Sequence, residues 1–133
     1  MTRIRLEKAQ RLLKLNREMQ KLEEEKLASA RGQQAELREE QDNLIDTLSG
    51  VSDMQALPTP MVLQRLRKLE DRQRALEVEI TARSTSLRTV ATRAKFSERL
   101  TKEYELQHKR AVEEKALHEV IERVLRKSDA SLP

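Results

Sequence analysis

The sequence predicts an all-α fold in which two long helices form an antiparallel coiled-coil hairpin, with the second helix overhanging the first. The first observation is composition: 38% of the 133 residues are charged and 2% are aromatic. This balance is typical of extended helices and cannot fill a thick globular core. The second is that apolar residues recur in alternating steps of four and three on both sides of one short break that contains Gly50 and Pro60, which is the spacing of a coiled-coil seam. The third is that the apolar residues before the break can be paired with those after it in a single register.

The register is antiparallel, and its midpoint falls at Gln55, inside the break. From the break outward, the predicted pairs are Leu48 with Val62, Leu44 with Leu66, Gln41 with Leu69, Leu37 with Gln73, Gln34 with Leu76, and Ala30 with Ile80. The polar seam residues Gln34, Gln41, Gln73 and Arg83 are interpreted as devices that fix this register at a cost in stability.

Charge supports the same pairing. Acidic residues of the first helix (Glu36, Glu39, Glu40, Asp42 and Asp46) fall opposite a basic stretch of the second (Arg65, Arg67, Lys68, Arg72 and Arg74). Flanking charges of opposite sign favour one orientation of a coiled coil, although each exposed pair contributes only about a few tenths of a kcal/mol.

The first helix is expected over about residues 3–49, with Gly50 as a left-handed cap at its carboxyl end. Below the matched layers, its seam is expected to continue through Leu12, Leu15, Met19, Leu22, Lys26 and Ala30. Two successive steps of four in that ladder predict a stutter, which locally unwinds a supercoil. Gly32 costs about 1 kcal/mol relative to Ala inside a helix, so the helix should be weakest there, as a thin point or a hinge.

The break is expected over about residues 50–59 and the second helix over about residues 60–127, so that residues 1–133 form one hairpin. Thr59 can cap the second helix and Pro60 can occupy its first position, where a missing N–H is harmless. Arg123, Arg126 and Lys127 are expected in the last turn, where basic residues suit the helix dipole. Residues 128–133 are expected to be a frayed tail.

The second helix is longer than the first, so its end should have no partner within the chain. In the predicted register Ile4 lies opposite Leu106, and the helix beyond that point carries an apolar stripe at helical spacing. The stripe comprises Ala111, Val112, Ala116, Leu117, Val120, Ile121, Val124 and Leu125. We expect Leu117, Val120, Ile121, Val124 and Leu125 to contact a partner protein.

Basic residues gather at the open end of the hairpin: Arg3, Arg5, Lys8, Arg11, Lys14, Arg17 and Lys21. Arg3, Arg5, Lys8 and Arg11 are expected to steer a partner toward this end. A basic helix also binds nucleic-acid phosphates, and the pI is about 9.6. Only Phe96 and Tyr104 are available to stack on bases, however, which makes nucleic-acid binding the less favoured alternative.

Enzyme motifs are close to absent, and we expect no catalytic residues, cofactor, metal or small-molecule substrate. His108 and His118 lie about 15 Å apart along a helix, too far to share one metal ion. There is no glycine-rich phosphate loop and no cysteine. The chain has neither a secretion signal nor about 18 consecutive apolar residues, so a soluble, cytoplasmic protein is expected.

One segment supports a family resemblance. Residues 114–121 read Glu-Lys-Ala-Leu-His-Glu-Val-Ile, which is similar to the C-terminal run of flagellar export proteins of the FliJ type and their virulence-secretion relatives of the YscO type. The resemblance implies a coiled-coil stalk whose open end enters the hexameric ATPase of a type III secretion system. It also implies a contact with the export gate through residues spaced like Val62, Leu66, Leu69 and Gln73. The alternatives are a basic coiled-coil nucleic-acid binder and a scaffold that self-associates through its overhang.

Overall fold

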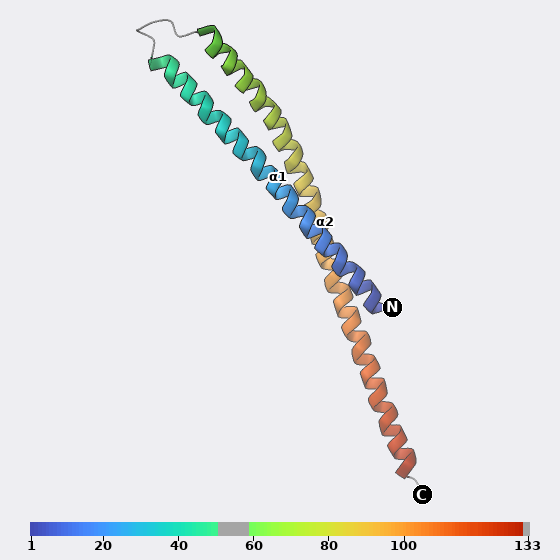
Figure 1. Cartoon of the computed structure of the whole chain (residues 1–133). Coiled ribbons are helices and arrows are strands. Elements are labelled where there is room, and N and C mark those ends of the chain that lie inside the picture. The colour runs from blue at the N-terminus through green and yellow to red at the C-terminus, as the bar shows by residue number, and fades with distance from the viewer. Residues whose placement is uncertain (51–58, 132–133) are drawn as a thin grey trace. The chain divides into compact units, whose positions relative to one another are not determined.

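The computed structural model describes residues 1–50 and 59–131, which form helix α1 (Thr2–Gly50) and helix α2 (Thr59–Ser131). The two helices pack against each other as an all-α helical hairpin (Figure 1), and the described residues contain no strand. The predicted fold class is therefore confirmed. Gly50 ends α1 and Thr59 begins α2, whereas Gln55 lies outside the described residues.

The carboxyl end of α2 was predicted wrongly. The helix continues to Ser131, so residues 128–131 are helical, and its last turn contains no basic residue. Arg123, Arg126 and Lys127 thus lie before that turn. No glycine follows Gly50 and no proline stands between Pro60 and Pro133, so the sequence provides no helix breaker between Lys127 and Ser131.

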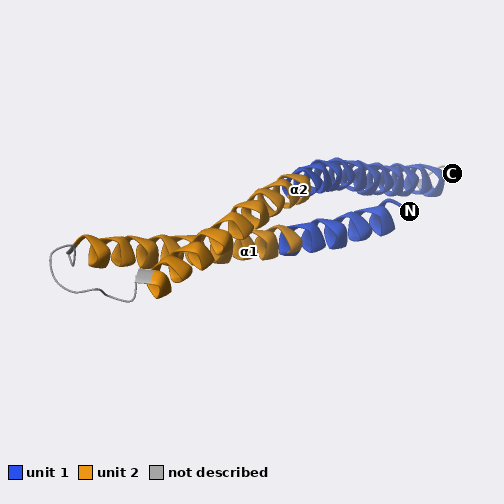
Figure 2. Ribbon diagram, turned by 90° about the horizontal axis from the view of Figure 1, so that it is seen from above, with its two compact units in different colours: residues 1–18, 91–133 blue, residues 19–90 orange. Residues whose placement is uncertain are grey.

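The structure divides into two compact units, shown in different colours in Figure 2. One comprises residues 19–90, and the other comprises residues 1–18 together with residues 91–133. Each unit combines a segment of α1 with a segment of α2.

The unit of residues 19–90 contains the six predicted layers, and all twelve of their residues are buried or half-buried. Leu76 is fully buried and Leu69 is 2% exposed, at the centre of this core. The amide of Gln73 donates a hydrogen bond of 2.9 Å to Oε1 of Gln41, so these polar seam residues satisfy one another. At the edge of the same unit, Nε of Arg65 donates to Oε1 of Glu40 at 2.9 Å, an ion pair between the two oppositely charged stretches.

The predicted continuation of the seam on α1 is wrong. Leu12, Leu15, Met19 and Leu22 are between 39% and 53% exposed, and Lys26 is also exposed. Apart from half-buried Glu7, which flanks Leu6, the buried and half-buried positions up to Ala30 are instead Thr2, Leu6, Ala9, Leu13, Asn16, Gln20, Glu23, Leu27 and Ala30. These alternate strictly in steps of three and four, so there is no stutter.

The seam of α2 keeps the same alternation from Val62 to Ala111. Beyond Ile80, the seam residues are all buried or half-buried: Arg83, Leu87, Val90, Ala94, Ser97, Thr101, Tyr104, His108 and Ala111. Several of these residues are small or polar, and so are Ala9 and Asn16 on α1. The heptad periodicity of the packed helices therefore outweighs side-chain size in deciding which residues are buried.

Candidate partner-binding surfaces

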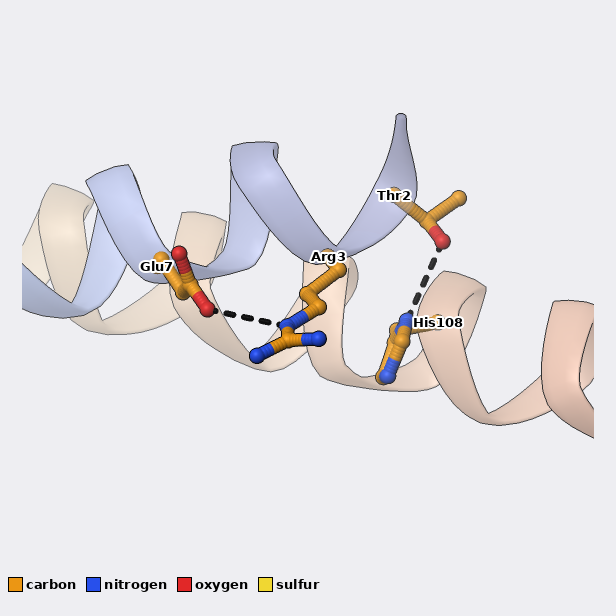
Figure 3. Close-up of polar contacts among 4 residues, drawn as sticks. All are labelled: Thr2, Arg3, Glu7 and His108. Atoms are coloured by element: carbon orange, nitrogen blue, oxygen red, sulfur yellow. Dashed lines mark hydrogen bonds and ion pairs between the residues drawn. The ribbon is translucent and has the colours of Figure 1, made fainter.

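In the unit of residues 1–18 and 91–133, the start of α1 packs against α2 as far as His108. Oγ1 of Thr2 and Nδ1 of His108 form a hydrogen bond of 3.1 Å, as Figure 3 shows. This pair lies in the register centred on Gln55. Ala111 is half-buried, and every residue from 112 to 130 is exposed. The predicted overhang of the second helix is therefore present.

The overhang carries the predicted apolar stripe. Its large members are 46–60% exposed: Leu117, Val120, Ile121, Val124 and Leu125. Fully burying a side chain of this kind stabilises a complex by about 1.5–3 kcal/mol relative to leaving it in water. Five such residues on one helix provide a large driving force for association.

Most of the stripe lies beside the hairpin seam rather than on it. After Ala111 the seam positions are occupied by Lys115, His118, Glu122 and Leu125, so only Leu125 among the five large stripe residues stands on the seam, and Nε2 of His118 lies 3.2 Å from Oε1 of Glu122. The apolar residues Leu117 and Ile121 each stand one position earlier, about 100° around the helix. A partner that covers Leu117 and Ile121 must therefore approach from a different side of α2 than α1 does.

The four predicted steering residues lie on the exposed surface of α1, in the same unit as the overhang. Nε of Arg3 donates to Oε1 of Glu7 at 3.1 Å (Figure 3), so the charge of Arg3 is partly balanced by its neighbour. The side chains of Arg5 and Lys8 instead line a hollow on the surface. Arg11 is exposed. The steering role of these residues remains a prediction.

The four positions predicted to contact an export gate belong to the hairpin itself. Leu69 is buried and the Gln73 amide is hydrogen-bonded to Gln41, so these two residues stabilise the contact between helices. Val62 and Leu66 are half-buried, which leaves only their outer edges available to a partner.

Sequence reasoning missed a groove in the unit of residues 1–18 and 91–133. One part of the groove is lined by Leu12, Asn16, Thr92, Arg93, Phe96 and Ser97. The adjoining part is lined by Arg5, Lys8, Ala9, Leu12, Leu100 and Tyr104. Leu12 lines both parts. One feature of the sequence could have revealed this groove. Leu12, Leu15, Met19 and Leu22 each stand one position before a seam residue, so they form a regular apolar row beside the seam.

Among residues 1–50 and 59–131, no three His, Asp or Glu side chains come close enough together to hold a metal ion. Neither α1 nor α2, as far as the structure describes them, contains a stretch apolar enough to cross a bilayer.

Comparison with known proteins yields no relative: no family model, no curated protein and no solved structure matches this chain significantly.

Proposed function

We propose that this chain is a non-enzymatic helical-hairpin stalk or adaptor that couples the hexameric ATPase of a flagellar or type III protein secretion system to its export gate. It would act in the cytoplasm, where its partner proteins would hold it next to the membrane-embedded secretion machinery. The proposal combines the resemblance of residues 114–121 to the FliJ and YscO type with the unpaired end of α2.

The exposed stripe of the overhang is the observation that carries the proposal. Leu117, Ile121 and Val124 are at least 46% exposed at the end of a helix whose preceding portion is packed against α1. A stalk needs such a projecting, apolar end in order to bind within the ring of a larger protein. The basic start of α1 lies in the same unit and would attract an acidic ring during encounter.

A binding experiment tests the proposal. The full chain is titrated against the purified secretion ATPase and, separately, against the soluble domain of the gate protein from the same cell. We expect saturable binding to the ATPase that falls at least tenfold in the triple variant L117S/I121S/V124S. The control is Val78→Ser, because Val78 is an apolar residue that is even more exposed but lies in the other unit.

Two results would contradict the proposal. Undiminished ATPase binding by the triple variant would exclude the stripe as the contact. A wild-type chain that binds neither partner, but forms a dimer that the triple variant abolishes in sedimentation, would identify a self-associating scaffold instead.

A further inference from the structure

The groove missed by sequence reasoning has apolar walls on both helices. Leu12 contributes from α1, and Phe96 and Leu100 contribute from α2. Phe96 is 64% exposed and is the only phenylalanine of the chain. A large aromatic side chain standing in an open groove is the kind of residue that dominates binding energy in protein interfaces.

The groove exists because the seam beneath it is made of small side chains. Ala9, Ala94, Ser97 and Thr101 are all less than 9% exposed, and the amide of Asn16 donates a hydrogen bond of 2.6 Å to Oγ of Ser97. Small residues permit closely spaced helices. The larger apolar residues beside them consequently stand at the sides of the groove, where the hairpin leaves part of each side chain exposed.

The rim of the groove is basic. Arg5 and Lys8 line one part and Arg93 lines the other, while no acidic side chain lines either part. The surrounding chain has the same sign: residues 1–18 contain six basic and two acidic residues, and residues 91–111 contain six basic and three acidic residues. An occupant therefore needs an apolar face flanked by negative charge.

We propose that this groove binds an acidic amphipathic helix of a partner protein, which adds a third helix to this unit. The apolar face of the partner packs against Leu12, Phe96 and Leu100, and its carboxylates pair with Arg5, Lys8 and Arg93. The lining of the groove on α2 extends from Thr92 to Tyr104, or about 18 Å along the helix. Three to four turns of a partner helix fill that length.

Charge disfavours a second copy of this chain as the occupant. The overhang is the exposed amphipathic helix that a second copy would offer, but residues 112–130 contain four basic and five acidic residues. Arg123, Arg126 and Lys127 would meet the basic rim at close range, where like charges are costly.

The inference does not depend on the proposed role in secretion, because the groove and the overhang stripe share no residue. The probe for the groove is a fluorescein-labelled synthetic helix of about 18 residues, monomeric in sedimentation, with Leu on one face and Glu on the other. Fluorescence anisotropy measures its binding to the full chain. A second peptide carries Lys in place of every Glu.

We expect the Glu peptide to bind at least tenfold more tightly than the Lys peptide. Phe96→Ala should weaken binding of the Glu peptide at least tenfold, and so should the surface double variant K8E/R93E, whose fold is checked by circular dichroism. The matched controls are Val78→Ala, an exposed apolar residue of the other unit, and the overhang triple variant L117S/I121S/V124S. Both controls should bind the Glu peptide as the unmodified chain does.

Four results would overturn the inference. They are equal binding of the two peptides, unchanged binding in both groove variants, a chain dimer that Phe96→Ala dissociates, and displacement of the Glu peptide by a short DNA duplex. The third result would assign the groove to a second copy, and the fourth would assign it to nucleic acid.

Discussion

Replacing Gly32 by Ala should stabilise the protein. Gly32 lies in the interior of α1, in the unit of residues 19–90, and is exposed. An added Cβ would meet no atom within 4 Å, so the substitution introduces no clash. Glycine in a helix interior is about 1 kcal/mol less favourable than alanine, because it loses more backbone entropy on folding. The variant G32A should therefore gain nearly this whole amount.

Urea denaturation followed by circular dichroism at 222 nm measures the gain. The midpoint should rise while the slope stays unchanged, because the substitution alters neither the folded contacts nor the surface exposed on unfolding. For a chain of this length, about 1 kcal/mol corresponds to an increase of about 4 °C in the melting temperature. Ala82→Gly is the matched control, because Ala82 is an exposed interior residue of α2 in the same unit. It should lose a similar amount.

The reasoning is refuted if G32A is neutral or destabilising while Ala82→Gly loses about 1 kcal/mol. That combination would mean that the backbone at Gly32 is not regular helix in solution. It would also favour the interpretation of Gly32 as a hinge.

Three further predictions concern the seam and its edges, all measured by urea denaturation. Glu23→Leu should stabilise the protein by about 1–2 kcal/mol, because Glu23 Oε2 is buried without a hydrogen-bond partner among the described residues; a loss of stability would show that the carboxylate is satisfied in solution. Asn16→Ala should lower the free energy of unfolding by about 1–3 kcal/mol, because it leaves buried Ser97 Oγ without its donor. The double variant N16A/S97A should recover part of that loss. If the losses of the two single variants simply add in the double variant, the result argues against the hydrogen bond. Glu40→Gln should cost less than about 1 kcal/mol, because its pair with Arg65 is solvent-exposed; a larger loss, or one that 0.5 M salt fails to reduce, would contradict this view.

The layers nearest the break could be predicted from the sequence, because side-chain size and heptad spacing agree there. Leu69 and Leu76 are buried and Leu44, Leu48 and Leu66 are half-buried, and all five are large apolar residues at heptad positions. Thr2 and His108, far from the break in sequence, also fall in this register. A single register could be extrapolated because heptad packing propagates along both helices.

The start of α1 could not be predicted in this way, because size and spacing disagree there. A ladder of large residues through Leu12, Leu15 and Met19 competes with a ladder of smaller or polar ones through Ala9, Asn16 and Gln20. Hydrophobicity favours the first ladder in isolation. The uninterrupted alternation from the break favours the second, and the side chains on α2 that match it are themselves small. To recognise the groove, one has to see that small seam residues of α1 lie opposite small seam residues of α2. This is visible only when both helices are considered together.

The displacement of the apolar positions after Ala111 has a consequence for how the protein can evolve. If α1 were lengthened upstream in the same register, its new turns would face Lys115, His118, Glu122 and Leu125 and would leave Leu117 and Ile121 at the flank. A longer first arm would therefore cover Leu125 but would not shield Leu117 and Ile121 from other molecules. These two residues stay available for a foreign chain whatever the length of the arm beside them, and masking them within the chain would require changing the tail itself.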